Sequence, residues 1–170
     1  LSGNVEGKIY PVSANELQVD RPFAHELVSA NGMQGTTNAE GNYLISGLSG
    51  AATFNAKLEG PWAKVLNVQT DEAYHSANVD VPGTHDLNWR DFDNSYKQEE
   101  SNVFYHTNIV HDYITSYGID DMNLQMTVNV NLPSSCNAHY ESGTPSINFY
   151  QPNTATCESS ALSSGVIYHE

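Results

Sequence analysis

The chain has 170 residues, enough for one large domain or two small ones, and carries 20 acidic against 6 basic side chains, a formal charge of −14. This charge argues against nucleic acid or an anionic membrane surface as a partner, because both would be repelled. No apolar stretch in the sequence approaches the length that spans a bilayer.

Residues 1–70 show the alternation and turn signals of short β-strands. The first strand is expected over 4–11, and a later one ends at the hairpin dipeptide Asn31-Gly32, where both residues tolerate a positive φ. Further strands are expected over 42–45, 51–58 and 63–68. We expect these segments to form an all-β sandwich of about seven strands.

This first part resembles the transthyretin-like, carboxypeptidase-regulatory type of β-sandwich. The resemblance rests on the strand Gly3–Ile9 and on Thr37–Tyr43, which matches the hairpin pattern T-(D/N)-x-x-G-x-Y. It implies an accessory domain without chemistry of its own. We accordingly interpret His25 and Glu26 as an exposed pair on a strand rather than as ligands.

Residues 71–97 have the composition of an acidic connecting segment. Within it, the alternating oxygen-bearing side chains of Asp91-Phe92-Asp93-Asn94 could bind Ca²⁺. A solvated loop is the favoured interpretation, because the turn glycine and the distal glutamate of a calcium loop are missing. The aromatic residues of this region, Trp62, Trp89 and Phe92, are expected to hold it against a neighbouring domain.

A helix is expected from Lys97, because apolar residues recur at steps of three and four. The expected stripe consists of Val103, Thr107, Val110, Ile114 and Tyr117. Gly118 follows it as a C-terminal cap. His106 and His111 are five residues apart, so they lie on different faces and are expected to be packing or surface residues.

After the helix, apolar and polar residues alternate from Leu124 to Leu132, which predicts a half-buried strand ending at Pro133. A hairpin is expected over 137–150. From Ser159 a helix begins, with Ser163 or Ser164 as its N-cap.

Cys136 and Cys157 are the two cysteines of the chain. A disulfide between them would close a loop of about 22 residues, worth about 3 kcal/mol in the loop-entropy model. An even cysteine count in a chain poor in lysine favours this bridge over two buried thiols, and with it an exported protein.

The last two residues, His169 and Glu170, match the beginning of the zinc-protease motif H-E-x-x-H. Together with three upstream motifs, they make residues 98–170 resemble the N-terminal catalytic subdomain of gluzincins, the thermolysin-like and fungalysin-like zinc metallopeptidases. The motifs are the helix pattern N-x-F-Y-x-x-N-x-x-H-D over 102–112, the hairpin pattern N-A-x-(Y/W)…I-x-(F/Y) over 137–149, and the segment 164–170, which is similar to the run (D/S)-x-V-x-H-E but has one more residue between Val166 and His169.

The resemblance implies a role for four residues. His169 would bind Zn²⁺, and Glu170 would act as general base toward a metal-bound water. Asn137, through its side-chain amide, and Ala138, through its carbonyl, would bind the backbone of an extended substrate added to an edge strand. The second histidine and the third ligand lie beyond residue 170, so we expect the isolated chain to have no peptidase activity.

The sequence therefore predicts an α+β fold: a sandwich over 1–70, a connecting segment over 71–97 and an incomplete metallopeptidase domain over 98–170. The expected function is that of a fragment of a secreted zinc endopeptidase. Its partners would be protein or peptide substrates and the remainder of the catalytic domain. The alternatives are a non-enzymatic extracellular binding module and, less in keeping with the helix and hairpin motifs, a protease-inhibiting prosegment.

Overall fold

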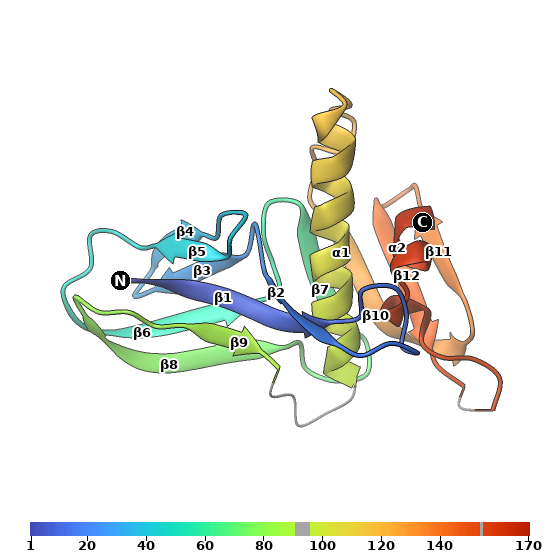
Figure 1. The fold of residues 1–170 in the computed structure, drawn as a ribbon, viewed down its shortest axis with the longest axis horizontal. Helices are drawn as coiled ribbons and strands as arrows, with labels where there is room; N and C mark the ends of the chain where they lie inside the picture. Colours follow the sequence, from blue (N-terminus) through green and yellow to red (C-terminus); the bar gives the residue numbers. More distant parts are fainter. Residues whose placement is uncertain (91–95, 154) are drawn as a thin grey trace.

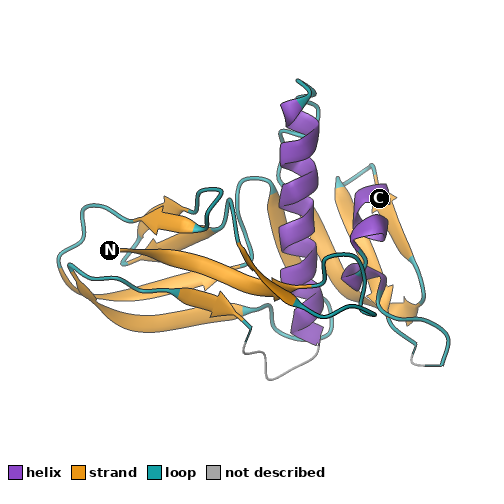
Figure 2. Cartoon of the chain, in the orientation of Figure 1, coloured by secondary structure: helices purple, strands orange, loops and turns teal. Residues whose placement is uncertain are grey.

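A computed structural model describes residues 1–90, 96–153 and 155–170. Over these residues the chain forms three four-stranded β-sheets and two α-helices (Figure 1, Figure 2), in agreement with the α+β class. The strands are β1 Ser2–Ile9, β2 Val19–Pro22, β3 Leu27–Ala30, β4 Met33–Thr36, β5 Asn42–Leu44, β6 Gly50–Lys57, β7 Ala63–Asn67, β8 Tyr74–Val81, β9 Leu87–Trp89, β10 Met126–Ser135, β11 Ala138–Glu141 and β12 Ser146–Gln151. The helices are α1 Tyr96–Ser116 and α2 Ser164–His169, and a 3-10 turn, η1 Ser160–Leu162, precedes α2.

Two of the sheets face each other in the N-terminal part of the molecule. One has the order β2-β1-β5, with β9 also paired to β1, and the other has the order β4-β3-β6-β8. In β1, Val5, Gly7 and Ile9 are buried while their neighbours are less so, as expected for a strand with one face on a core. The two layers meet where Tyr43 of β5 stacks on Phe54 of β6, with ring centroids 5.5 Å apart.

The strand assignment differs from the sequence interpretation in two places. The strand β7, expected in the sandwich, instead pairs in parallel with β10 of the third sheet. The segment 71–97, expected to be a connection, contributes β8 and β9 to the two N-terminal sheets. In β8 the less exposed positions include His75 and Ala77, which are not the large apolar residues that reveal a strand in a sequence.

The third sheet has the order β11-β12-β10-β7, in which β7, β10 and β12 run parallel and β11 is an antiparallel edge strand. The strand β10 forms where alternation predicted it, but it continues beyond Pro133 to Ser135. It does so through register shifts against β12, with positive φ at Asn131 (60°) and Ser134 (95°). The predicted disulfide is confirmed between Cys136 and Cys157, and it connects the end of β10 to the loop before η1.

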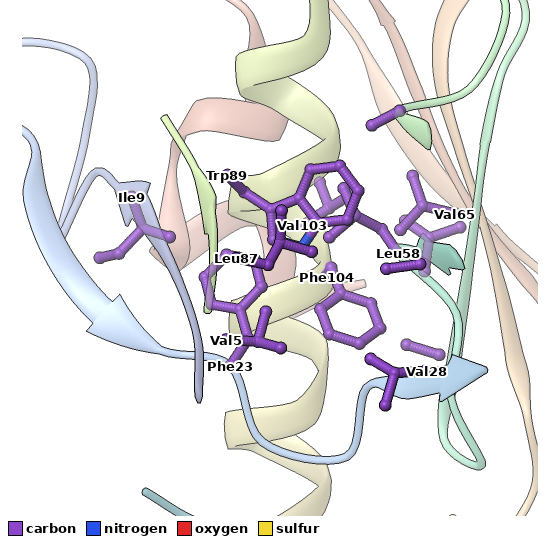
Figure 3. Close-up of a cluster of buried hydrophobic side chains, with 14 of the residues drawn as sticks. Val5, Ile9, Phe23, Val28, Leu58, Val65, Leu87, Trp89, Val103 and Phe104 are labelled. Carbon is purple, nitrogen blue, oxygen red and sulfur yellow. The ribbon is translucent and has the colours of Figure 1, made fainter. Parts of the chain in front are cut away.

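The helix α1 lies between the N-terminal sheets and the third sheet (Figure 1). Figure 3 shows the core at this seam, where Phe104 of α1 lies among side chains from both parts, including Phe23 and Val65. Gly118, the second residue after the helix, has a φ of 76°, as predicted for its cap. The predicted apolar stripe is only partly correct: Val103 is fully buried, whereas Tyr117 is 68% exposed.

Candidate functional site

The dipeptide from the zinc-protease motif lies at the end of α2. Ser163 is the N-cap residue, as predicted, although its side chain makes no capping hydrogen bond. His169 is the last helical residue and is exposed, and the backbone N–H of Glu170 donates to the carbonyl of Val166 at 3.2 Å. Because α2 has only six residues, its conformation depends on tertiary contacts.

One such contact comes from Tyr168, next to His169. The ring of His106 on α1 lies between the Tyr168 hydroxyl, 2.7 Å from Nδ1, and the carbonyl of Tyr10, 2.9 Å from Nε2. Since a carbonyl can only accept, Nε2 carries the proton and Nδ1 accepts from the Tyr168 hydroxyl. Burial lowers the pKa of His106, which agrees with this neutral form. His106 thus joins α2 to the loop after β1, and its interpretation as a packing residue is confirmed.

The second pair of expected site residues lies on the edge strand. Asn137 is exposed just before β11, and its backbone carbonyl accepts from the Tyr150 N–H and from the Ser160 hydroxyl, both at 3.0 Å. Ala138 is the first residue of β11 and lies opposite Phe149 of β12. The hairpin expected from the sequence is therefore present, and among the described residues β11 pairs on one side only, with β12.

The pair His169-Glu170 and the pair Asn137-Ala138 are connected indirectly. Ser160 belongs to η1, the turn that leads into α2, and its bond to Asn137 holds the start of β11 against that turn. Within residues 1–90, 96–153 and 155–170, no group of three or more His, Cys, Asp or Glu side chains could hold a metal ion. The proposed calcium ligands at 91–94 lie outside the described residues.

A polar cluster that the sequence did not predict lies where α1 meets the N-terminal sheets. The Asp112 carboxylate is 2.9 Å from Nε2 of His25 and 3.1 Å from Nδ1 of His111. Nε2 of His111 faces Oδ1 of Asn123 at 3.1 Å, so both of its ring nitrogens face acceptor oxygens. The His111 ring also stacks on Trp62, with centroids 4.2 Å apart. The motif letters H-D in α1 were the available signal for this cluster.

Buried carboxyl groups form a second unpredicted feature. Glu26 is fully buried and accepts from the indole N–H of Trp89 at 3.0 Å and 3.1 Å, so its interpretation as an exposed strand residue is wrong. Burial raises the pKa of Glu26 well above its usual value, and the Trp89 bond opposes this only in part. At the start of α1, burial also raises the pKa of Glu100 and raises that of Glu99 to about 7.

A histidine pair lies between the two N-terminal sheets. The Nε2 atoms of His75 and His85 are 3.1 Å apart, so one ring donates to the other. Burial, and secondarily the neighbouring His85, lowers the pKa of His75. Both rings lie against Phe54, which makes the pair part of the packing between the layers.

Comparisons with protein-family models, with curated proteins and with solved structures find no match to this chain. None of the helices described is long and apolar enough to cross a bilayer.

Proposed function

We propose that this chain is part of a secreted zinc-dependent endopeptidase. In this proposal the two N-terminal sheets, formed by β1–β6, β8 and β9, are a transthyretin-like accessory sandwich, and β7 together with residues 98–170 forms the first part of the catalytic domain. The observation that carries the proposal is the hydrogen bond from Ser160 to the Asn137 carbonyl, because it ties the turn leading to His169-Glu170 to a sheet edge that is open to an extended peptide. The disulfide supports export from the cytosol.

The edge strand β11 supplies the substrate-binding part of the proposal. A strand paired on one side presents unpaired N–H and C=O groups, and an extended peptide can add to them as a further strand. The side chain of Asn137 is exposed at the beginning of this edge, where its amide can donate to and accept from a peptide backbone. Binding by main-chain pairing would give broad sequence tolerance, with specificity set by side-chain pockets.

The residues present do not by themselves make a zinc site. A catalytic zinc takes three protein ligands, and the described residues place only the imidazole of His169 beside Glu170. The other ligands would have to come from the remainder of the catalytic domain. We therefore derive no catalytic step for the 170-residue chain and expect it to lack peptidase activity.

The test begins with the gene sequence beyond the codon for Glu170. We expect it to complete the motif H-E-x-x-H and to continue with a zinc-binding glutamate. The longer protein should then bind zinc and cleave peptides. Glu170→Gln should abolish cleavage but retain zinc, and His169→Ala should lose both. The control variant His75→Gln, in the N-terminal sheets, should retain both. A gene that ends at this codon, or a longer protein without zinc-dependent cleavage, would overturn the proposal.

A non-enzymatic extracellular binding module is the second candidate. It is favoured by large apolar side chains exposed on the distal half of α1 and in the turn that follows it: Ile109 is 41%, Tyr113 61% and Tyr117 68% exposed. Ile109 and Tyr113 are one turn apart on the same helix face, and the Tyr117 ring packs against Tyr113, with centroids 5.1 Å apart. The same gene sequence separates the two candidates, because a binding module needs no second zinc ligand.

A further inference from the structure

An open groove lies on the third sheet, on the face turned away from the core. Its volume is about 360 Å³, within the range of small-molecule sites, which begins at about 300 Å³. The lining comes from β10, from the residues just before it, and from the end of the β11–β12 hairpin. In β10, Met126, Val128 and Val130 are buried, so Thr127 and Asn129 point to the other face and form the floor of the groove.

The lining is polar but uncharged. Among the described residues, none that lines the groove carries a charge, although the chain has a formal charge of −14. Most of the lining consists of amide and hydroxyl side chains: Gln125, Thr127, Asn129, Thr144 and Ser146. An ion would find no opposite charge here, and an apolar molecule would leave the polar groups without partners. The groove therefore suits a neutral polar ligand.

The side-chain amide of Asn129 is held in one orientation by Asn148. Nδ2 of Asn148 donates to the carbonyl and to the hydroxyl of Ser146, at 3.4 Å and 3.1 Å. Because a carbonyl can only accept, Oδ1 of Asn148 is the atom that accepts from Nδ2 of Asn129, at 2.8 Å. Oδ1 of Asn129 therefore points away from Asn148. Among the described residues it has no hydrogen-bond partner, and it is accessible to water.

Two more polar atoms of the lining are accessible. Nε2 of Gln125 donates to the Gly60 carbonyl at 2.7 Å, so Oε1 of this exposed side chain is left to accept from a ligand. The Thr127 hydroxyl is also accessible and has no partner within the part of the chain that the structure describes. The groove thus offers two oriented amide oxygens and one hydroxyl. A matching ligand needs several donors, which a molecule with many hydroxyl groups provides.

The strands under the groove do not favour an extended peptide as the ligand. The strand β10 pairs with β12 on one side and with β7 on the other, and β12 pairs with β10 and β11. Their backbone groups are engaged, so a peptide cannot add here as a further strand, in contrast to β11. Recognition must use side chains, with Leu124 and Pro145 as apolar surface beside the polar floor.

We propose that this groove binds a neutral sugar, a single hexose unit of a glycan. Its hydroxyl groups donate to Oδ1 of Asn129 and Oε1 of Gln125 and form a hydrogen bond with the Thr127 hydroxyl. Its C–H groups pack on Leu124 and Pro145. The inference goes beyond the proposed peptidase function and does not rest on it.

The test is an NMR titration of the ¹⁵N-labelled 170-residue chain with the methyl glycosides of glucose, mannose and galactose. We expect at least one of them to give saturable shifts of the Asn129 and Gln125 side-chain amides, with a dissociation constant on the order of 1 mM. The methyl glycoside of glucuronic acid should bind at least about fivefold more weakly than that of glucose, because its carboxylate meets an acidic protein without a cation in the groove. The dipeptide N-acetyl-alanyl-alanine amide should give no saturable shift at these two amides.

A matched pair of variants locates the binding. Thr127→Val keeps the shape of the side chain but removes the hydroxyl, and it should weaken sugar binding about fivefold. Thr36→Val removes a hydroxyl from an exposed position on β4, outside the lining, and should leave binding unchanged. Unchanged dispersion of the amide spectrum checks that both variants fold. The proposal is overturned if no glycoside saturates, if the glucuronide binds as well as the glucoside, if the dipeptide saturates in their place, or if Thr127→Val binds like the native chain.

Discussion

The buried carboxyl group of Glu99 makes the stability of the protein depend on pH in a predictable way. Glu99 lies in the first turn of α1 and is 4% exposed. Burial, aided by the charge of Glu100, raises its pKa from 4.5 to about 7, although a bond with Ser159 opposes the shift. The folded state therefore retains the Glu99 proton to a higher pH than the unfolded state does.

The sign and size of the effect follow from this difference. Below about pH 4.5 the carboxyl is protonated in both states and contributes no pH dependence. Between about pH 4.5 and 7 the unfolded state binds fewer protons, so the free energy of unfolding falls as the pH rises. At 1.36 kcal/mol for each pH unit between the two pKa values, the loss by pH 8 is about 3 kcal/mol.

Glu99→Gln should remove this loss, because an amide does not titrate. From pH 4 to pH 8 we expect the free energy of unfolding of the variant to rise by about 2–3 kcal/mol relative to that of the native chain. This figure allows for the lost interaction of a carboxylate with the helix N-terminus. The measurement is urea unfolding of both proteins at half-unit steps of pH. Glu16→Gln, at an exposed position, controls for the removal of one charge from an acidic chain. A Glu99→Gln curve parallel to that of the native chain would refute the reasoning.

Three further changes test other contacts. Replacing Cys136 and Cys157 by serine should lower the free energy of unfolding by about 3 kcal/mol, since the bridge spans a sequence separation of 21; an unchanged urea midpoint would contradict the loop-entropy argument. Tyr168→Phe leaves Nδ1 of His106 without its donor, which should cost about 1–2 kcal/mol and speed hydrogen exchange in α2; unchanged exchange would mean that α2 is held by other contacts. Gly60→Ala would place a Cβ 1.9 Å from a backbone carbonyl oxygen and should cost more than about 2 kcal/mol in urea unfolding, unless the loop can shift.

Local patterns predicted the elements whose signals lie within a few residues. The alternation from Leu124 onward predicted β10, and the glycine after α1 predicted the helix end. The same reasoning missed β8, in which His75 and Ala77 occupy two of the four less exposed positions, so that apolar alternation is confined to Val79 and Val81 at its end. It also placed β7 in the wrong sheet, since pairing between Ala63–Asn67 and β10 depends on residues about sixty positions apart.

Apart from Val103 and Phe104, the buried face of α1 is polar, and this polar part could not be predicted. Asn102 is fully buried: its Oδ1 accepts from the Tyr10 N–H at 2.9 Å and its Nδ2 donates to the Ala161 carbonyl at 2.8 Å. Glu100 is also fully buried and accepts from the Asn67 amide and the Ala73 N–H. A hydropathy pattern counts such residues as exposed, whereas here each one satisfies groups on another element.

The helix motif N-x-F-Y-x-x-N-x-x-H-D has a structural explanation that needs no catalysis. Its first residue, Asn102, connects the end of β1 to η1, and Phe104 packs against Phe23 with ring centroids 5.8 Å apart. Its last residues, His111 and Asp112, connect α1 to the segments around Trp62 and His25. Apart from the bond between Asn102 and Ala161 of η1, each of these contacts joins the helix to a segment from the N-terminal half of the chain.

The path of the chain also makes the two parts of the molecule depend on each other. After β6 the chain leaves the N-terminal sheets to form β7 at the edge of the third sheet, and it then returns for β8 and β9 before α1. In sequence, β7 of the third sheet therefore lies between β6 and β8 of the N-terminal sheets, and β8 and β9 lie between β7 and β10 of the third sheet. Because the seam also holds Phe104 and the fully buried Glu26, separating the two parts would expose both apolar surface and buried polar groups. The N-terminal sheets are thus part of the scaffold that holds α1, and through His106 and Tyr168 they extend that support to α2 and His169.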